Sequence, residues 1–323
     1  MAKRKSQKGA LFTSRQIALI VLCGVVLAFA VLMAISARCE HPFLPTWEEL
    51  FDTFLPQEER DTSWQMEVID VGNADSILFT NGSHHMLIDA GERGDGRIVL
   101  AALEKRGIKK LDYVIATHFH ADHIGGMEEV IRGVDIGTFL LSYMPEDKTP
   151  TSKTYTGMLT ALVDREVPVR DVKPGETYTL GDAAVEILGP AGEFDDMNNQ
   201  SVVCRVTCNG RRFLMMGDAE VQAEKSILMS RADVSADVIK LGHHGSSTSS
   251  SGDFLDAVSP TYSVMTCGAG NSYDHPHKET LARVQELGLK NYRSDECGTI
   301  VFTVATDGDI SVTTERGSTD GRE

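Results

Sequence analysis

Short runs of apolar residues, alternating with polar residues or bounded by glycine turns, recur over most of the chain. The runs "SWQMEVIDV" (63–71) and "DSILFT" (75–80) have the patterns typical of strands. In "GRIVLAALEKRGI" (96–108), helical spacing places Leu100 and Leu103 on one face. The same patterns predict further strands at 84–90, 112–117, 138–143, 177–181, 183–189, 201–210, 211–217, 236–242, 299–306 and 310–315. Further helices are predicted at 124–134, 152–167, 220–232 and 278–288.

Strands and helices are mixed in both halves of this region, so each half is expected to form a sheet covered by helices. We therefore predict an α/β layered sandwich at residues 64–315. Residues 38–63, which combine prolines, acids and aromatics, are predicted to be a linker or stalk. Residues 316–323 are predicted to be a disordered tail.

The N-terminal segment has a different composition. Residues 1–15 form a leader with five basic residues and no acid, and Ile17–Ile35 is an uncharged apolar run long enough to span a bilayer. We predict a transmembrane anchor at residues 16–37, with the N-terminus in the cytoplasm because basic residues precede the run. A cleaved signal peptide is the alternative, since Ala34–Ser36 offers small residues to a peptidase. The remainder is expected outside the cytoplasm, attached to the cell membrane or secreted.

Composition limits the classes of function. Without the five basic residues of the leader, 26 basic residues face 47 acidic ones, a net charge of −21. A broad nucleic-acid surface needs Lys and Arg to neutralise phosphates, so this balance argues against one and still permits a local site. The odd number of cysteines after Cys23 argues against a disulfide framework, and a Cys267–Cys297 bridge stays open.

The run "THFHADHIGG" (117–126) places three histidines and an aspartate within six residues, directly after a predicted strand. His118 and His120 project from the same side of an extended chain, and Asp122 and His123 fall where a helix begins. Imidazole and carboxylate together suit zinc, manganese or iron. A loop of hydrogen-bonded histidines with Asp122 as a helix cap is the competing interpretation, but it leaves the burial of these polar groups uncompensated.

This motif resembles the signature of the metallo-β-lactamase fold hydrolases. The segments "VIDVGNADSILF", "LIDAGERGDG", "LMMGDAE", "DVIKLGHHGSSTSSS" and "NSYDHPHKETLARV" resemble, in order, the hydrolase domain of ComEC-type competence proteins and their free-standing relatives. The resemblance covers about residues 64–315. It implies an αββα four-layer sandwich that holds two divalent metal ions, Zn or Mn.

The resemblance also implies individual ligands. For the histidine that closes the second metal position we favour His243, with His244 facing the substrate, and the reverse assignment stays open. The other expected ligands are His118 and His120 for the first ion, Asp122 and His123 for the second, and Asp218 as a bridge between them.

One departure from the superfamily concerns the first ion. Many members supply a further histidine before the bridging aspartate, but here no histidine occurs between His123 and His243. The corresponding segment, "DDMNNQS" (195–201), resembles the Asn/Ser-rich segment of the ComEC branch. Asn199 or Ser201 is expected to fill the gap through water, or the first ion to be loosely held.

Other residues are expected to support the site. His275 and Tyr273 are expected to contact a phosphate or protonate a leaving group, unless their loop merely starts a helix. Asp122 and His244 complete the set expected to take part in catalysis. The hydroxyls of "GSSTSSSGD" (245–253) are expected to bind substrate oxygens at the rim of the cleft. Three further polar side chains carry weaker expectations: Asp75 beside the site, Asp89 as an orienter of a ligating histidine, and Lys240 as an anion contact or an edge lysine.

Three functions are compatible with these residues. The first is a membrane-anchored phosphodiesterase or nuclease-like hydrolase that uses metal-activated water, with single-stranded DNA as a candidate substrate. The second keeps the metal chemistry but acts on a cell-envelope phosphoester, an ester, a lactone or a β-lactam. The third is a non-catalytic binding module that kept the fold. No obligate protein partner is deduced.

Overall fold

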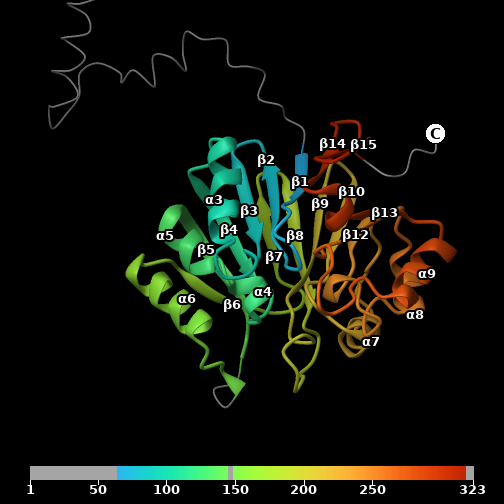
Figure 1. The fold of residues 1–323 in the computed structure, drawn as a ribbon, viewed down its shortest axis with the longest axis horizontal. Coiled ribbons are helices and arrows are strands. Elements are labelled where there is room, and N and C mark those ends of the chain that lie inside the picture. Colours follow the sequence, from blue (N-terminus) through green and yellow to red (C-terminus); the bar gives the residue numbers. More distant parts are fainter. Residues whose placement is uncertain (1–63, 145–147, 318–323) are drawn as a thin grey trace, which may run out of the picture. The chain divides into compact units, whose positions relative to one another are not determined.

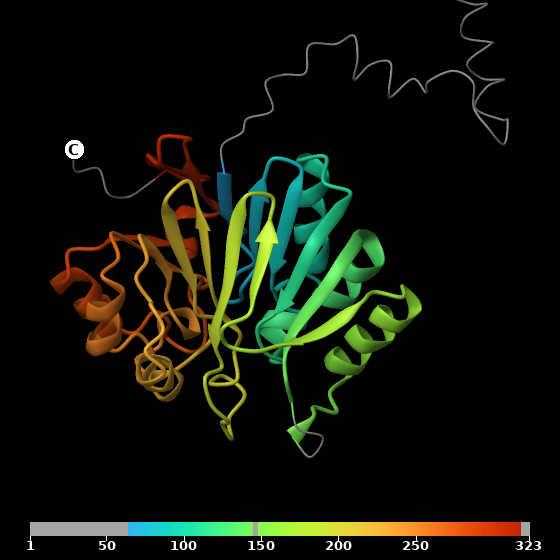
Figure 2. The same cartoon turned by 180° about the vertical axis from the view of Figure 1, so that it is seen from behind.

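The computed structural model describes residues 64–144 and 148–317. Two β-sheets lie face to face in this region, and helices cover the outer face of each (Figures 1 and 2). The predicted leader, anchor and linker at residues 1–63 lie outside the described residues. Within those residues, no helix combines the length and the apolar character needed to cross a membrane.

The first sheet has eight strands in the order β15-β14-β1-β2-β3-β4-β5-β6. The strands β3 to β6 run parallel to one another, whereas β1, β2, β14 and β15 pair in antiparallel fashion. The last two strands of the chain thus complete the sheet that the first two begin. Their bounds are β1 (Trp64–Val68), β2 (Ile77–Asn81), β3 (His84–Ile88), β4 (Lys110–Ala116), β5 (Asp135–Ser142), β6 (Val169–Val172), β14 (Ile300–Val304) and β15 (Ile310–Thr314).

The second sheet has seven strands in the order β13-β12-β11-β10-β9-β8-β7. The strands β10 to β13 are parallel, and β7 to β10 are antiparallel. Their bounds are β7 (Thr177–Leu180), β8 (Ala183–Gly189), β9 (Val203–Cys208), β10 (Arg211–Met215), β11 (Val238–Lys240), β12 (Tyr262–Met265) and β13 (Lys290–Arg293).

Helices form the two outer layers (Figure 1). On the first sheet lie α3 (Gly96–Lys105), α4 (Ala121–Ile124), α5 (Met127–Gly133) and α6 (Lys153–Asp164), and on the second lie α7 (Val221–Met229), α8 (Gly252–Val258) and α9 (Lys278–Glu286). A short helix, α10 (Ser294–Cys297), follows β13. Ser152 caps α6, since its Oγ accepts a hydrogen bond from the backbone N–H of Tyr155 at 3.2 Å.

Three separate hydrophobic cores hold the four layers together, one at each interface. Trp64 is fully buried between the sheets, where its ring lies 4.4 Å from that of Phe213 on the opposite sheet. In β14 the alternation of buried and half-buried residues turns Ile300, Phe302 and Val304 towards this central core. The α/β layered sandwich predicted from the sequence is therefore confirmed.

The structure differs from the predicted elements in a few places. The helix expected at 124–134 is two helices, α4 and α5, because Gly125 and Gly126 lie directly against another loop. The strands β6, β12 and β13 were not predicted from the sequence. Each has only four residues, which is too short for a reliable periodic pattern. Arg316, assigned to the tail from the sequence, binds the domain through its Nη2 atom, 2.6 Å from Asp70 Oδ2.

Candidate metal centre

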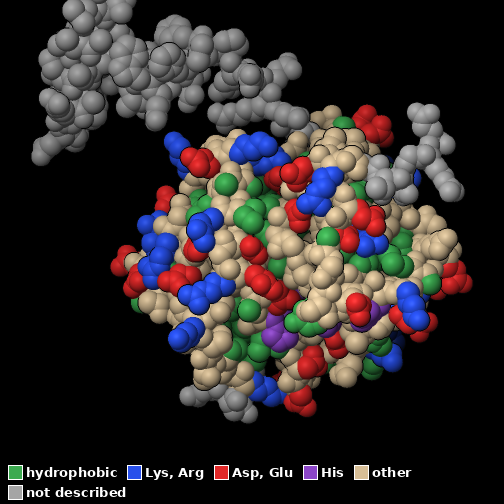
Figure 3. All heavy atoms as spheres, viewed as in Figure 1, with side chains coloured by type: hydrophobic (Ala, Val, Ile, Leu, Met, Phe, Trp, Pro, Cys, Tyr) green, Lys and Arg blue, Asp and Glu red, His purple; other side chains and the backbone are tan. Residues whose placement is uncertain are grey.

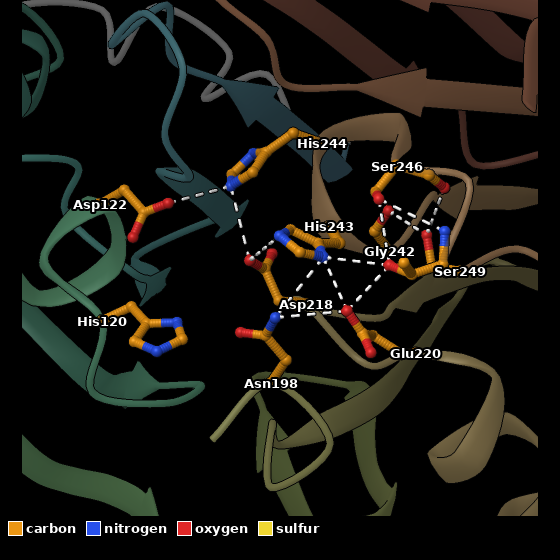
Figure 4. A network of polar contacts seen from close by, with 12 residues as sticks. His120, Asp122, Asn198, Asp218, Glu220, Gly242, His243, His244, Ser246 and Ser249 are labelled. Carbon is orange, nitrogen blue, oxygen red and sulfur yellow. Dashed lines mark hydrogen bonds and ion pairs between the residues drawn. The ribbon is translucent and has the colours of Figure 1, made fainter. Parts of the chain in front are cut away.

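Loops from both sheets bring the predicted site residues to one edge of the sandwich. His118 and His120 follow β4, and Asp218 follows β10. His243 and His244 follow β11 in a short 3-10 turn, η2 (His243–Gly245). The strands β10 and β11 are parallel, so their carboxyl ends place these loops side by side. Figure 4 shows His120 and Asp122 on one side of a common opening, with Asp218, His243 and His244 across from them.

Four residues, here called the tight group, form the larger of two groups of candidate metal ligands among the described residues: Asp122, His123, Asp218 and His244. One ligand atom from each lies within 4.8 Å of all the others. The Nε2 atom of His123 is 3.2 Å from Asp218 Oδ1, and that of His244 is 3.3 Å from Asp122 Oδ2 and 3.6 Å from Asp218 Oδ2. Two imidazoles and two carboxylates at such spacing are a donor set suited to a divalent transition metal.

The electrostatics of this group are those of a charged cluster enclosed by protein. Burial lowers the pKa of His123, but the carboxylates of Asp218 and Asp89 outweigh burial and raise it well above its usual value. Burial likewise raises the pKa of Asp218, and the imidazoles of His123 and His244 reverse this and hold it well below its usual value. The carboxylate is thus ionised and ready to bind a cation.

Two buried atoms in the group lack a hydrogen-bond partner: His123 Nε2 and Asp218 Oδ1. Both side chains are almost completely buried, and a buried polar atom without a partner is costly. A cation between these atoms would satisfy both of them. The residues present therefore fit a divalent metal ion.

Residues behind the ligands fix the orientation of their rings. His123 Nδ1 lies 2.7 Å from Asp89 Oδ2, and His244 Nδ1 lies 2.8 Å from the backbone carbonyl oxygen of Thr266. Such contacts leave the Nε2 atoms free for a metal. The expectation that Asp89 orients a ligating histidine thus agrees with the geometry.

Lys240 is fully buried in β11, a strand inside the sheet, so the sequence-based alternatives of an anion contact and an edge lysine do not describe it. Its Nζ atom lies 2.7 Å from Asp75 Oδ2 and donates a hydrogen bond to the carbonyl oxygen of Gly217 at 2.9 Å. Asp75 also accepts a hydrogen bond from Thr266 Oγ1. Lys240 and Asp75 therefore link the two halves of the fold beneath the candidate ligands.

His118 and His120 form a second group beside the first. The Nε2 atom of His118 lies 3.0 Å from His120 Nδ1 and 3.9 Å from Asp218 Oδ2. His118 is buried, and burial, followed by repulsion from His123, lowers its pKa well below the usual value. It is therefore neutral, as a metal ligand must be, whereas His120 is exposed at the opening.

The structure does not place His243 in the tight group. His244 occupies that position. The geometry therefore favours His244 as the ligand, which the sequence analysis left open, over His243, which it preferred. The side chain of His243 is one-quarter exposed, and its Nε2 atom lies 3.9 Å from Asp218 Oδ2. Sequence reasoning could not separate the two neighbours because the conformation of the turn decides which ring faces which carboxylate.

Asn199 and Ser201 are fully buried, and neither lines the cleft beside the ligands. Asn199 Oδ1 accepts hydrogen bonds from the backbone N–H groups of Glu220 and Ala223 at the start of α7. Ser201 Oγ accepts from the N–H of Asp218 and lies 3.3 Å from His118 Nδ1, behind that ring. That either residue fills the gap at the first ion through water stays a prediction; in the structure both residues support the loops that carry the ligands.

A cleft of about 380 Å³ opens above the ligands. Tyr273 stands at this cleft with its side chain well exposed, and its ring stacks on His275 at a centroid distance of 5.7 Å. Burial, followed by repulsion from His243, lowers the pKa of His275 to about 4. The residues that line the cleft are Asn73, Glu92, His120, Ala121, Asp122, Asn198, Asp218, His243, His244, Tyr273 and His275.

The serine-rich loop at 245–253 does not line this cleft, contrary to expectation. Ser249 is buried and its hydroxyl donates to the carbonyl oxygen of Gly242 at 2.6 Å. The backbone N–H groups of Ser250 and Ser251 donate to the buried carboxylate of Glu224. These hydroxyl and amide groups stabilise the turn that carries the two histidines.

Gly125 and Gly126 are required by close packing of the protein itself. An added Cβ on Gly126 would overlap the carbonyl oxygen of Ala90, and one on Gly125 would overlap the backbone N of Arg93. The backbone N–H of Ala90 donates a hydrogen bond to the carbonyl oxygen of His123 at 2.8 Å. The glycines thus let the loop that carries His123 pack against the loop that begins with Asp89.

Three polar residues of the cleft lining were not among the predicted site residues: Asn73, Glu92 and Asn198. Each lies in a turn or loop whose composition is typical of turns, so no pattern separates it from an ordinary polar loop residue. Figure 3 shows histidine side chains reaching the surface beside acidic ones on the face in view. None of the residues that line the cleft is Lys or Arg.

The comparisons with known proteins agree with this geometry. Residues 69–268 match the family model of the metallo-beta-lactamase superfamily. The chain belongs to the metallo-beta-lactamase superfamily. The group of candidate metal ligands at the edge of the α/β sandwich agrees with this membership.

Two relatives confirm the resemblance to ComEC-type competence proteins. The chain is 28% identical to ComE operon protein 3 of Bacillus subtilis (strain 168) over 261 residues, which is 74% of this chain and 33% of that protein. It is 29% identical to competence protein ComA of Neisseria gonorrhoeae over 258 residues, or 78% of this chain and 34% of that protein. The chain thus spans about a third of the length of each relative.

Among solved structures, the metallo-beta-lactamase fold protein YhfI of Bacillus subtilis matches with a TM-score of 0.48 and 14% identity. The match covers 77% of this chain and 99% of that protein.

Proposed function

We propose that this superfamily member is a phosphodiesterase or nuclease-like hydrolase that uses two divalent metal ions, Zn or Mn. One observation carries the proposal: Asp122, His123, Asp218 and His244 converge at a cleft, with His118 and His120 beside them. Two neighbouring cations suit phosphodiester hydrolysis, because they offset the charge that develops on both the attacking and the leaving oxygen. The names of the two relatives, both competence-related, support a nucleic-acid substrate.

Bound ions would supply Lewis acidity and lower the pKa of water in the cleft. The protein supplies the arrangement around them. Asp218 faces both groups of ligands and holds them at a common carboxylate. Asp122 is part-exposed, its Oδ2 faces His244, and its Oδ1 makes no hydrogen bond to the described residues. Burial raises the pKa of Asp122, but the hydrogen bond to His244 and the charge of His123 hold it well below its usual value, so ionised Asp122 can accept a hydrogen bond from water in the cleft and orient it.

His275 and Tyr273 act on the substrate in different ways. With a pKa of about 4, His275 is neutral near pH 7 and cannot give up a proton as an imidazolium ion. It binds a phosphate oxygen as a neutral hydrogen-bond donor. The exposed ring of Tyr273 offers a flat surface to a nucleobase or another aromatic leaving group.

The charge of the cleft favours a substrate with few phosphates inside it. Its lining contains the carboxylates of Glu92, Asp122 and Asp218 and no Lys or Arg. Without cationic side chains, only bound ions can neutralise a phosphate there. A short single-stranded DNA end would place few phosphates in the cleft, and so would a small cell-envelope phosphodiester. Anchoring to the outer face of the membrane by residues 16–37 is part of the proposal.

The test uses the purified full chain with Mn²⁺ or Zn²⁺ and three substrates: bis(p-nitrophenyl) phosphate, single-stranded DNA and nitrocefin. We expect turnover of the first, lost by about 10²-fold or more in Asp122→Asn. Asp112→Asn, a surface carboxylate that bonds His84, is the matched control and should stay active. DNA cleavage selects the nuclease, whereas nitrocefin turnover alone, or inactivity of metal-loaded protein towards all three, contradicts the proposal.

A further inference from the structure

The neighbouring residues His243 and His244 both point towards Asp218 from one short turn (Figure 4). We propose that they bind different ions, an inference that rests on the two-ion centre proposed above. His243 completes the first position, with His118, His120 and Asp218, and Glu220 orients it. His244 belongs to the second position, with Asp122, His123 and Asp218. The histidine pair then supplies the ligand that the segment before Asp218 lacks.

The other contacts of the two rings differ, although both rings approach the same carboxylate oxygen of Asp218. Its Oδ2 atom lies 3.6 Å from His244 Nε2, 3.9 Å from His243 Nε2 and 3.9 Å from His118 Nε2. His244 also contacts Asp122 of the tight group, whereas no such contact joins His243 to Asp122. The centroids of the His243 and His244 rings are 6.0 Å apart, and their planes are 67° apart.

The second nitrogen of His243 is held in the manner of a metal ligand. Its Nδ1 atom lies 3.0 Å from Glu220 Oε1, just as His123 Nδ1 contacts Asp89 at 2.7 Å. Thr248 Oγ1 donates to the same Glu220 oxygen at 2.8 Å and fixes its position. His243 Nε2 makes no hydrogen bond to the described residues and faces the cleft. A loop histidine with a merely structural role would not need this second carboxylate.

The backbone of the turn also indicates that both side chains are needed. His243 and His244 have φ angles of 50° and 53°, in the left-handed region that favours glycine. Two consecutive non-glycine residues in this region are strained, and such strain is concentrated at functional sites. In this turn His244 Nε2 lies beside Asp122, whereas His243 Nδ1 lies beside Glu220.

The open side of the first position has no other candidate among the described residues. Asn199 and Ser201 are bonded behind the ligands, and no histidine occurs between His123 and His243 in the sequence. Asn198 reaches the cleft, but its Nδ2 atom is directed at Glu220 and His243 Nδ1. Besides His118, His123 and His244, His243 is the one histidine of the described residues with a ring nitrogen within 4.0 Å of an Asp218 oxygen.

Metal-to-protein ratios test the assignment without reference to activity. The full chain and its variants are loaded with Mn²⁺, freed of excess metal and analysed by elemental mass spectrometry. We expect a ratio of two for the unmodified chain and one for both His243→Ala and His244→Ala. The double variants decide: His118→Ala/His243→Ala removes two ligands of one ion and should keep a ratio near one, whereas His118→Ala/His244→Ala should bind none.

The reverse result overturns the proposal. If His118→Ala/His243→Ala binds none and His118→Ala/His244→Ala keeps one ion, His243 serves the second position. A ratio of two in His243→Ala also overturns it. Glu220→Gln provides a variant with less effect on folding and should weaken one of the two affinities about 10- to 100-fold. His84→Ala, on the surface beside Asp112, is the matched control and should bind two ions. Near-UV circular dichroism confirms that each variant is folded. Because the metal-to-protein ratios do not depend on turnover, they test the assignment even if the protein has no phosphodiesterase activity.

Discussion

The imidazole Nδ1 of His123 lies 2.7 Å from the carboxylate Oδ2 of Asp89, and both side chains are excluded from solvent. The two residues come from loops after neighbouring parallel strands, β4 and β3. The same carboxylate accepts hydrogen bonds from the N–H and the hydroxyl of Thr117, the residue before His118. Asp89 therefore orients one ligand directly and fixes the start of the loop that carries the others.

Replacing Asp89 with Asn is expected to weaken metal binding without removing a ligand. The amide keeps the shape of the side chain but loses the charge that holds the His123 ring, so the Kd of the second ion should rise about 10- to 100-fold. Isothermal titration calorimetry measures this. Asp112→Asn, which changes a carboxylate near the surface, should leave the Kd unchanged, and an unaltered Kd in Asp89→Asn would contradict the role given to Asp89.

The metal-free chain is expected to lose stability as the pH rises above neutrality. The folded-state pKa of His123 lies well above the unfolded value of about 6.5, because Asp218 and Asp89 overcome the effect of burial. The protonated ring therefore stabilises the fold fully below about pH 6.5, and this contribution is lost as the pH rises through the raised pKa. Unfolding in urea between pH 7 and 8.5 measures it. A flat or rising free energy of unfolding in the metal-free chain would contradict the prediction, and His123→Gln should show a weaker dependence.

Lys240→Met is expected to destabilise the fold by about 3–5 kcal/mol. The change leaves the buried carboxylate of Asp75 without its cation, and an unpaired buried charge is far more costly than the loss of the pair. The double variant Asp75→Asn/Lys240→Met should recover part of the loss. Lys110→Met, at an exposed lysine 3.7 Å from Asp112, should change the free energy of unfolding by less than about 0.5 kcal/mol. Equal effects of the two lysine variants would refute the structural role of Lys240.

The four cysteines in the described part of the chain should resist alkylation in the native state. Cys204, Cys208, Cys267 and Cys297 are buried and unpaired, so the Cys267–Cys297 bridge left open from the sequence is not formed. Burial raises the pKa of Cys204 and Cys267 to about 12 and that of Cys208 to about 11, which leaves almost no thiolate at pH 8. Peptide mass spectrometry after iodoacetamide treatment should find these four modified only in urea.

Tyr273→Ala is expected to raise the KM for short single-stranded DNA about fivefold or more, because stacking of a base on an aromatic ring contributes about 1–3 kcal/mol. The side chain is 65% exposed, so the melting temperature should not change. Tyr273→Phe keeps the ring and should have a KM close to that of the unmodified chain. If Tyr273→Phe instead lowers kcat, the hydroxyl protonates the leaving group, and stacking is not its main role.

Local sequence patterns determined the secondary structure and the chemical type of the site. The alternation in Trp64–Val68 and the helical spacing in Gly96–Lys105 depend on neighbours along the chain, so they can be recognised without the fold. The spacing of His118, His120, Asp122 and His123 is local in the same sense. These residues alone predict a metal site after a strand.

Only the tertiary structure decided which distant groups complete that site. His244 contacts Asp122 across 122 positions of the chain, and Lys240 contacts Asp75 across the two sheets. Whether His243 or His244 faces Asp122 depends on two left-handed backbone conformations that no hydrophobic pattern encodes. The physical reason is the distance along the chain over which each property is determined. Periodicity shows which residues of one segment face the core or the solvent, whereas ligand geometry depends on how separate loops pack against one another.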